Sequence, residues 1–250
     1  MKWRGISMMK DVILFYSNPH ACFNTGENES LKEKVTILKR SYLFCLGAGV
    51  LIGLVIMAVE SFLQSKYGIS VYENLRRNGN EFRTNRSRAG NFILACLIAP
   101  FIEECTFRLP LLIKSTFLRW IILLVFILYF VVDIFKSDVY IWWYYAVLVI
   151  IFGGIIIFIS SDPSPILVRK KYNHLCWTLT VSFALLHVVN FYPLNITIFY
   201  LYPLYVLPQF VHGAVQSYLA IKYNSIVWPF LLHAGINSTA ELSRLITDSI

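Results

Sequence analysis

Charged side chains are scarce in this chain. Asp, Glu, Lys and Arg make up 14% of its 250 residues, whereas soluble domains carry about 25%. Hydrophobic residues account for 57%. This composition excludes an ordinary soluble domain and indicates an integral membrane protein. We therefore expect an all-α fold, a polytopic bundle of transmembrane helices.

Cysteine pairs and the common catalytic motifs are also missing. The five cysteines form no CxxC pair, which argues against a zinc ribbon and a disulfide framework. We interpret them as small buried hydrophobic side chains, with a Cys105 nucleophile beside Glu104 as an alternative. The sequence has no GxSxG, HExxH or phosphate-loop pattern. This absence excludes the commonest serine hydrolases, zincins and nucleotide-binding proteins.

The net charge is +8, but the distribution of that charge argues against nucleic acid as a partner. Basic residues gather beside apolar runs, which favours contact with anionic lipid at the ends of membrane spans. We expect membrane lipid as a partner and no nucleic acid. The two basic groups are Arg76, Arg77, Arg83, Arg86 and Arg88, and Arg169, Lys170 and Lys171.

Apolar runs of about 20 residues, the length that crosses a bilayer, follow one another along the chain. Their pattern predicts about seven spans in a multi-pass protein of the cell membrane. We expect a polar or amphipathic N-terminal segment over residues 1–40 and one helical membrane domain over residues 41–250. The predicted spans are residues 41–62, 91–113, 117–136, 139–160, 174–192, 196–221 and 226–246.

Three ionisable residues interrupt the second predicted span, in the stretch APFIEECTFRLP (residues 99–110). Glu104 and Arg108 are four residues apart, so on a helix they share a face and we expect them to pair. Glu103 lies about 100° away and has no partner on its own helix. Because an unpaired charge inside a bilayer is costly, we expect Glu103 to meet polar groups of other spans.

Two prolines bracket these residues. Pro100 removes a backbone hydrogen bond before the glutamates, and Pro110 does the same after Arg108. The N-terminal end of the short helical piece between them would favour negative charge at both glutamates. The alternative is that these are ordinary prolines of membrane helices.

Two later spans carry histidines. In SFALLHVVN, Phe183 and His187 share a helix face, and in WPFLLHAGINS, His233 and Asn237 do so. Deep polar groups must find partners within the bundle or line a wet cavity. We therefore expect Glu103, His187, His233 and Asn237 to meet in one cavity. The alternative for each histidine is a hydrogen-bonded structural role.

Other polar residues of the spans have simpler interpretations. His212 and Gln216 are also four residues apart and are expected near the same cavity. His20 and His174 are interpreted as structural. Asp133 lies near the end of its predicted span, so we expect it to reach the membrane interface.

Three patterns occur in separate spans and in a fixed order: EExxxR at Glu103, Glu104 and Arg108, FxxxH at Phe183 and His187, and HxxxN at His233 and Asn237. In this order they resemble the CPBP family, also called Abi. The family comprises CAAX prenyl proteases of the second type and bacteriocin-processing or immunity enzymes. The similarity covers residues from about 91 to 240.

The resemblance implies an intramembrane glutamic endopeptidase that cleaves membrane-associated or lipidated proteins or peptides without a cofactor. Glu103 and His187 would activate a water molecule. His233 and Asn237 would donate hydrogen bonds to the oxyanion of the tetrahedral intermediate. The supporting residues would be Glu104, Arg108 and Phe183.

Two alternative hypotheses remain. Glu103, His187 and His233 are the ligand types of a His₂Glu zinc site, so a zinc-dependent membrane metalloprotease is one. The other is a membrane transporter or a non-catalytic, immunity-type binding protein that uses Glu103 as a proton or substrate site. A transporter usually shows interrupted helices in matching halves, and this chain has no internal repeat.

Overall fold

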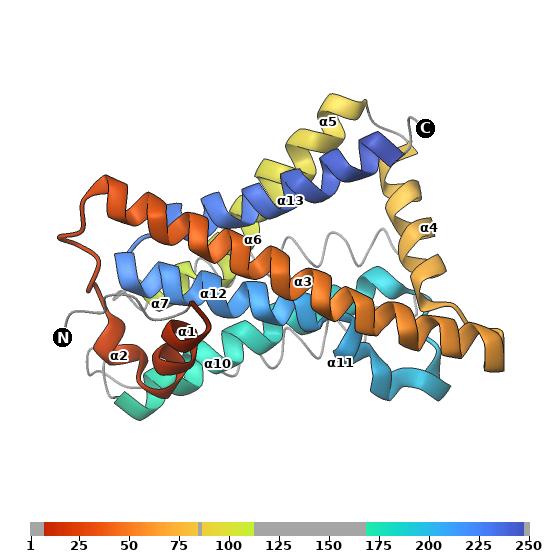
Figure 1. Cartoon of the computed structure of the whole chain (residues 1–250), viewed down its shortest axis with the longest axis horizontal. Coiled ribbons are helices and arrows are strands. Elements are labelled where there is room, and N and C mark those ends of the chain that lie inside the picture. Colours follow the sequence, from red (N-terminus) through yellow and green to blue (C-terminus); the bar gives the residue numbers. More distant parts are fainter. Residues whose placement is uncertain (1–7, 85–86, 113–168, 248–250) are drawn as a thin grey trace.

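The computed structural model describes residues 8–84, 87–112 and 169–247 (Figure 1). Within these ranges all regular structure is helical and no strand occurs, which confirms the all-α class. The helices are α1 (Met8–Ser17), α2 (Pro19–Cys22), α3 (Leu31–Tyr67), α4 (Val71–Thr84), α5 (Arg88–Ile93), η1 (Leu94–Ile98), α6 (Ala99–Phe107), α7 (Leu109–Leu112), α10 (Arg169–Leu186), η2 (His187–Phe191), η3 (Ile196–Leu201), α11 (Tyr202–Tyr205), α12 (Leu207–Tyr223) and α13 (Val227–Thr247).

Three helical segments are long and apolar enough to cross a membrane: Leu31–Tyr67, Asn173–Phe191 and Ile196–Tyr223. They correspond to the first, fifth and sixth predicted spans. The predicted count of about seven is not confirmed. The runs at 117–136 and 139–160, with Asp133, lie outside the described residues. The last predicted span forms α13, which is a helix of 21 residues but is not among the three.

The long helix α3 has clear signals at both ends. A capping box begins it, because the Ser30 side chain accepts the Glu33 N–H while the Glu33 carboxylate accepts the Ser30 N–H. Gly68 ends it with φ 64°, a left-handed conformation that glycine adopts without strain. Since α3 begins at Leu31, the predicted domain boundary at residue 40 falls inside this helix.

The N-terminal helix α1 packs into the bundle. Its Phe15 is fully buried and lies in the same apolar cluster as residues of α10 and α12. Asp11 on the same helix has a buried carboxylate oxygen that finds no hydrogen-bond partner within the described part of the chain. Desolvation by burial raises the pKa of Asp11, although the charges of Lys222 and Arg40 act in the opposite direction.

The packing brings together segments far apart in sequence. Helix α12 contacts α10, α13 and α3, while α13 also contacts η1 and α6. Figure 1 shows α5 and α6 running beside α13, with α4 reaching from the end of α3 toward the C-terminal end of α13. A larger apolar cluster lies around α10 and α12, and a second one lies around η2 and α11. The polar residues of α6, α10, η2, α12 and α13 face one another where these helices meet.

Candidate active site

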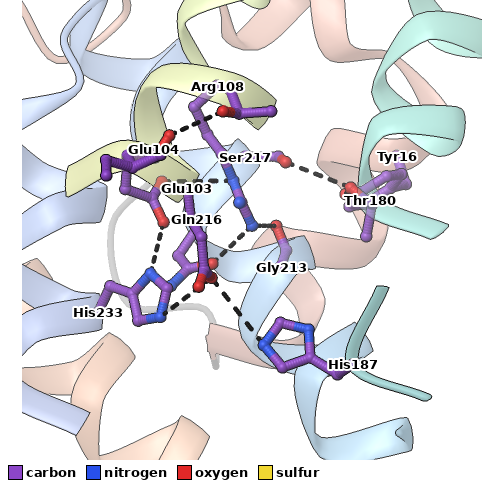
Figure 2. A network of polar contacts seen from close by, with 12 residues as sticks. Tyr16, Glu103, Glu104, Arg108, Thr180, His187, Gly213, Gln216, Ser217 and His233 are labelled. Atoms are coloured by element: carbon purple, nitrogen blue, oxygen red, sulfur yellow. Dashed lines mark hydrogen bonds and ion pairs between the residues drawn. The ribbon is translucent and has the colours of Figure 1, made fainter. Parts of the chain in front are cut away.

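Glu104 lies at the centre of a buried polar network (Figure 2). Its Oε2 is 3.4 Å from Arg108 Nε, and neither side chain is exposed. The predicted pair of Glu104 and Arg108 is therefore confirmed. The other oxygen, Oε1, lies 2.8 Å from His233 Nδ1, so one carboxylate joins α6 to α13. The sequence had not indicated this second contact.

Arg108 is held from three further directions. Its Nη2 donates to Gln216 Oε1 at 2.5 Å and to the carbonyl oxygen of Gly213 at 3.3 Å, both on α12. The guanidinium carbon lies 4.1 Å from the centre of the Phe183 ring on α10, a cation–π contact. A Cβ atom at Gly213 would come within 2.9 Å of Phe183 Cδ1 and 3.2 Å of Arg108 Nη2. Glycine is needed here because the arginine and the ring occupy that space.

Glu103 sits between two imidazole rings, as Figure 2 shows. Its Oε2 is 3.9 Å from His187 Nε2 and 3.8 Å from His233 Nε2. The predicted meeting of Glu103 with the two histidines is confirmed. Both distances are too long for a direct hydrogen bond. The Glu103 side chain is 23% exposed, against 0% for Glu104, so the two adjacent glutamates occupy unlike environments.

Both histidine rings are oriented through Nδ1. His187 Nδ1 lies 2.8 Å from the backbone carbonyl oxygen of Phe183, which can only accept, so Nδ1 carries the proton of this bond. His233 Nδ1 faces the Glu104 carboxylate in the same way. The Nε2 atom of each ring is thereby turned toward Glu103. Phe183 packs edge-on against both rings, with centroids 4.9 Å from His187 and 5.9 Å from His233.

The helix that carries the glutamates contains a wide turn just before them. In η1 the Ala99 N–H bonds to the Leu94 carbonyl, five residues back, which is the π-helix pattern. The next carbonyl, of Ala95, would find its π partner at residue 100, but Pro100 has no N–H. The Asn237 side chain fills this role, because its Nδ2 donates to Ala95 O at 2.9 Å.

This contact changes the interpretation of Asn237. From the sequence we predicted that the Asn237 amide donates a hydrogen bond to an oxyanion. In the structure this amide donates to the backbone carbonyl of Ala95. An amide nitrogen has two hydrogens, so the predicted role stays a prediction. The observed contact is structural and ties α13 to the turn that precedes Glu103.

Glu103, His187 and His233 supply the ligand types of a zinc site, so their spacing matters. Ligands at zinc distances of 2.0–2.2 Å in a tetrahedron lie about 3.4 Å apart. The observed separations of 3.8 and 3.9 Å are wider. Across the described ranges, no three His, Cys, Asp or Glu side chains have the arrangement of a metal site. Binding of zinc by these three side chains would require them to move closer together.

Several neighbours of the site come from positions that the three motifs do not include. Gln216 was expected near the cavity and is found on Arg108. His212 lies on the same helix as Gln216, α12, four residues before it. A buried chain of hydroxyl groups runs alongside, from Tyr16 on α1 to Thr180 on α10 and on to Ser217 on α12 (Figure 2). The four-residue spacing from His212 had indicated Gln216 in advance. No pattern in the sequence indicated the chain of hydroxyl groups.

Comparison with family models, with curated proteins and with solved structures found no match to this chain.

Proposed function

We propose that this chain is an intramembrane endopeptidase of the CPBP type, located in the cell membrane, which hydrolyses peptide bonds with water activated by Glu103 and His187. The observation that carries the proposal is the position of the Glu103 carboxylate between two histidine Nε2 atoms contributed by other helices. Three segments far apart in the sequence supply these groups. Their order along the chain is the order of the motifs that resemble the family.

The spacing of Glu103 and His187 suits a bridging water. With its proton on Nδ1, a neutral His187 presents a lone pair at Nε2, and an ionised Glu103 presents a second acceptor 3.9 Å away. Two acceptors do not bond to each other, but one water can donate a hydrogen to each. That water would attack the peptide carbonyl carbon while one of its protons passes to Glu103 or His187. The same proton would then pass to the departing amine.

His233 is the candidate donor to the oxyanion of the tetrahedral intermediate. Its Nδ1 is used by Glu104, so Nε2 can donate only when the ring carries both protons. A preorganised donor of this kind contributes roughly 3–4 kcal/mol to an acyl transfer.

Glu104 and Arg108 would support the reaction by orienting the His233 ring. Glu104 holds the His233 ring by Nδ1, and Arg108 holds Glu104, Gly213 and Gln216 in place. Phe183 lies between Arg108 and the two rings and limits their rotation. Neither side chain of this ion pair is exposed, so we assign it a supporting role and no contact with substrate.

The test is a cleavage assay with the purified full-length chain in detergent. A panel of apolar, membrane-associated and lipidated peptides is incubated with the wild type and with Glu103→Gln, and products are identified by mass spectrometry. We expect cleavage of at least one peptide by the wild type and none by the variant. Equal cleavage by both proteins would refute the assignment. Absence of cleavage across the panel, together with substrate-dependent proton movement in vesicles, would favour the transporter reading.

A further inference from the structure

Helix α4 lies against η2, the short helix that begins with His187. Asn74 and Asn78 are four residues apart on α4, so their side chains point to the same side. On that side the apolar residues Val71 and Leu75 pack into the cluster that contains Val188 of η2. The contact between the two helices thus combines apolar packing with two amide side chains.

The two asparagines bind the carbonyl groups at the end of η2. The last carbonyls of a helix have no helical N–H partner, and here the backbone turns extended at Tyr192 and continues into a proline. Each amide nitrogen donates to two carbonyl oxygens. The four contacts are Asn78 Nδ2 to Asn190 O at 3.0 Å and to Tyr192 O at 2.7 Å, and Asn74 Nδ2 to Phe191 O at 3.4 Å and to Pro193 O at 3.1 Å.

The far end of α4 is tied to the helix of the second histidine. Arg83 Nη2 lies 3.2 Å from Glu241 Oε2 on α13. Glu241 follows His233 by eight residues, which is about 12 Å along the helix. Helix α4 therefore contacts both elements that carry a histidine of the site, and it contacts η2 within four residues of His187.

We propose that Asn74 and Asn78 are positioning residues, which hold η2 so that His187 Nε2 faces Glu103. The proposal rests on the proposed function for its catalytic meaning, and on the four hydrogen bonds for its geometry. A 3₁₀-helix has strained hydrogen bonds and is short, so η2 depends on outside contacts for its placement. Because His187 is its first residue, a shift of η2 moves the ring relative to Glu103, which belongs to another helix.

The first test is kinetic. Asn78→Asp keeps the shape of the side chain but replaces both N–H donors by an acceptor that faces carbonyl oxygens. We expect kcat to fall by about 10- to 100-fold, because small misplacements of a catalytic group have effects of this size, while KM changes less than about twofold. Asn78→Gln, which keeps the amide, should retain more activity than Asn78→Asp. Arg76→Ala, on the exposed side of α4, is the matched control and should behave as wild type.

The second test does not need turnover. The full-length chain with ¹⁵N-labelled histidine is studied in detergent by NMR, with His187→Gln and His233→Gln used to assign the two rings. We expect Asn78→Asp to shift or broaden the His187 signals and to leave those of His233 as in the wild type. Unchanged His187 signals, or equal changes at both rings, would overturn the positioning role. If the wild type cleaves no peptide, the proposed function fails, and the His187 signals alone decide whether Asn78 positions the ring.

Discussion

The two adjacent glutamates should respond in opposite ways to the same chemical change. Glu103→Gln removes a base whose nearest ion-pair partner among the described residues is 3.8 Å away. Glu104→Gln removes the carboxylate that is 3.4 Å from a fully buried guanidinium. The replacement amide can still accept a hydrogen bond from His233 Nδ1, so the main loss falls on Arg108. Its remaining partners, Gln216 Oε1 and the Gly213 carbonyl, are neutral.

The size of each effect follows from these contacts. Breaking a buried ion pair by removing one partner costs about 3–5 kcal/mol. For a chain of this size, 1 kcal/mol corresponds to about 2–4 °C of melting temperature, so Glu104→Gln should melt about 6–20 °C lower. Glu103→Gln should change the free energy of unfolding by about 1 kcal/mol or less. Its turnover should fall by about 10²- to 10⁴-fold, the usual contribution of a general base.

The assay compares four variants in one detergent. Thermal unfolding and turnover of a peptide from the panel are measured for Glu103→Gln, Glu104→Gln, the double variant Glu104→Gln with Arg108→Gln, and Glu81→Gln. Glu81 is exposed on α4, so it controls for the chemical change itself. The double variant should recover part of the lost stability because it removes the stranded charge. Full activity in Glu103→Gln would refute the proposed mechanism. A Glu104→Gln protein that is as stable as Glu81→Gln would contradict the stabilising role of the ion pair.

Three further predictions concern metal, backbone and pH. A strong chelator should leave peptide cleavage unchanged and metal analysis should find less than one zinc per chain, whereas loss of activity that added zinc restores would favour the metalloprotease. Asn237→Ala should lower the free energy of unfolding by about 1–3 kcal/mol, because it leaves the Ala95 carbonyl without its donor. The loss should be smaller in a Pro100→Ala background, where residue 100 regains an N–H, and strictly additive melting temperatures would count against this account. Asp11 has its pKa raised by desolvation from 3.8 in the unfolded chain, so its contribution to stability falls as pH rises above about 4. Asp11→Asn should therefore raise the melting temperature at pH 7 more than at pH 4, and an equal gain at both values would show that the carboxylate is not the cause.

Part of the site followed from the sequence because charge inside a membrane is so restricted. A four-residue spacing was enough to pair Glu104 with Arg108, and the lack of any neighbour for Glu103 required partners from other helices. His187 and His233 were the candidates with suitable chemistry, and both are found there. This reasoning needs only helical periodicity and the cost of an unpaired charge.

Other contacts could not be deduced in this way. Periodicity relates residues on one helix, so it says nothing of which histidine receives the Glu104 carboxylate. The carbonyl of Gly213 is a backbone group, and no side-chain pattern marks it as a partner of Arg108. The role of Asn237 depends on the π-turn at η1, and Pro100 alone does not reveal where a helix widens. The number of spans was predicted from the lengths of apolar runs, and the last of these runs forms α13, which is long enough to cross a membrane but is not among the three helices that are also apolar enough.

The wide turn at η1 also fixes the rotational phase of everything that follows it. A π-turn accommodates one residue more than an α-turn, and one residue corresponds to about 100° of rotation. If the same residues formed an unbroken α-helix, the Ala99 N–H would bond to the Ala95 carbonyl, but Glu103 would be turned by about 100° away from both histidines. Deleting one residue between 96 and 98 would instead replace the π-turn by an α-turn and keep Glu103 near its present direction, with the Ala95 carbonyl facing Pro100, which has no N–H. The extra residue of this turn thus sets which side of the helix meets the histidines, so inserting one residue between η1 and Glu103 should be far more harmful than deleting one residue within η1.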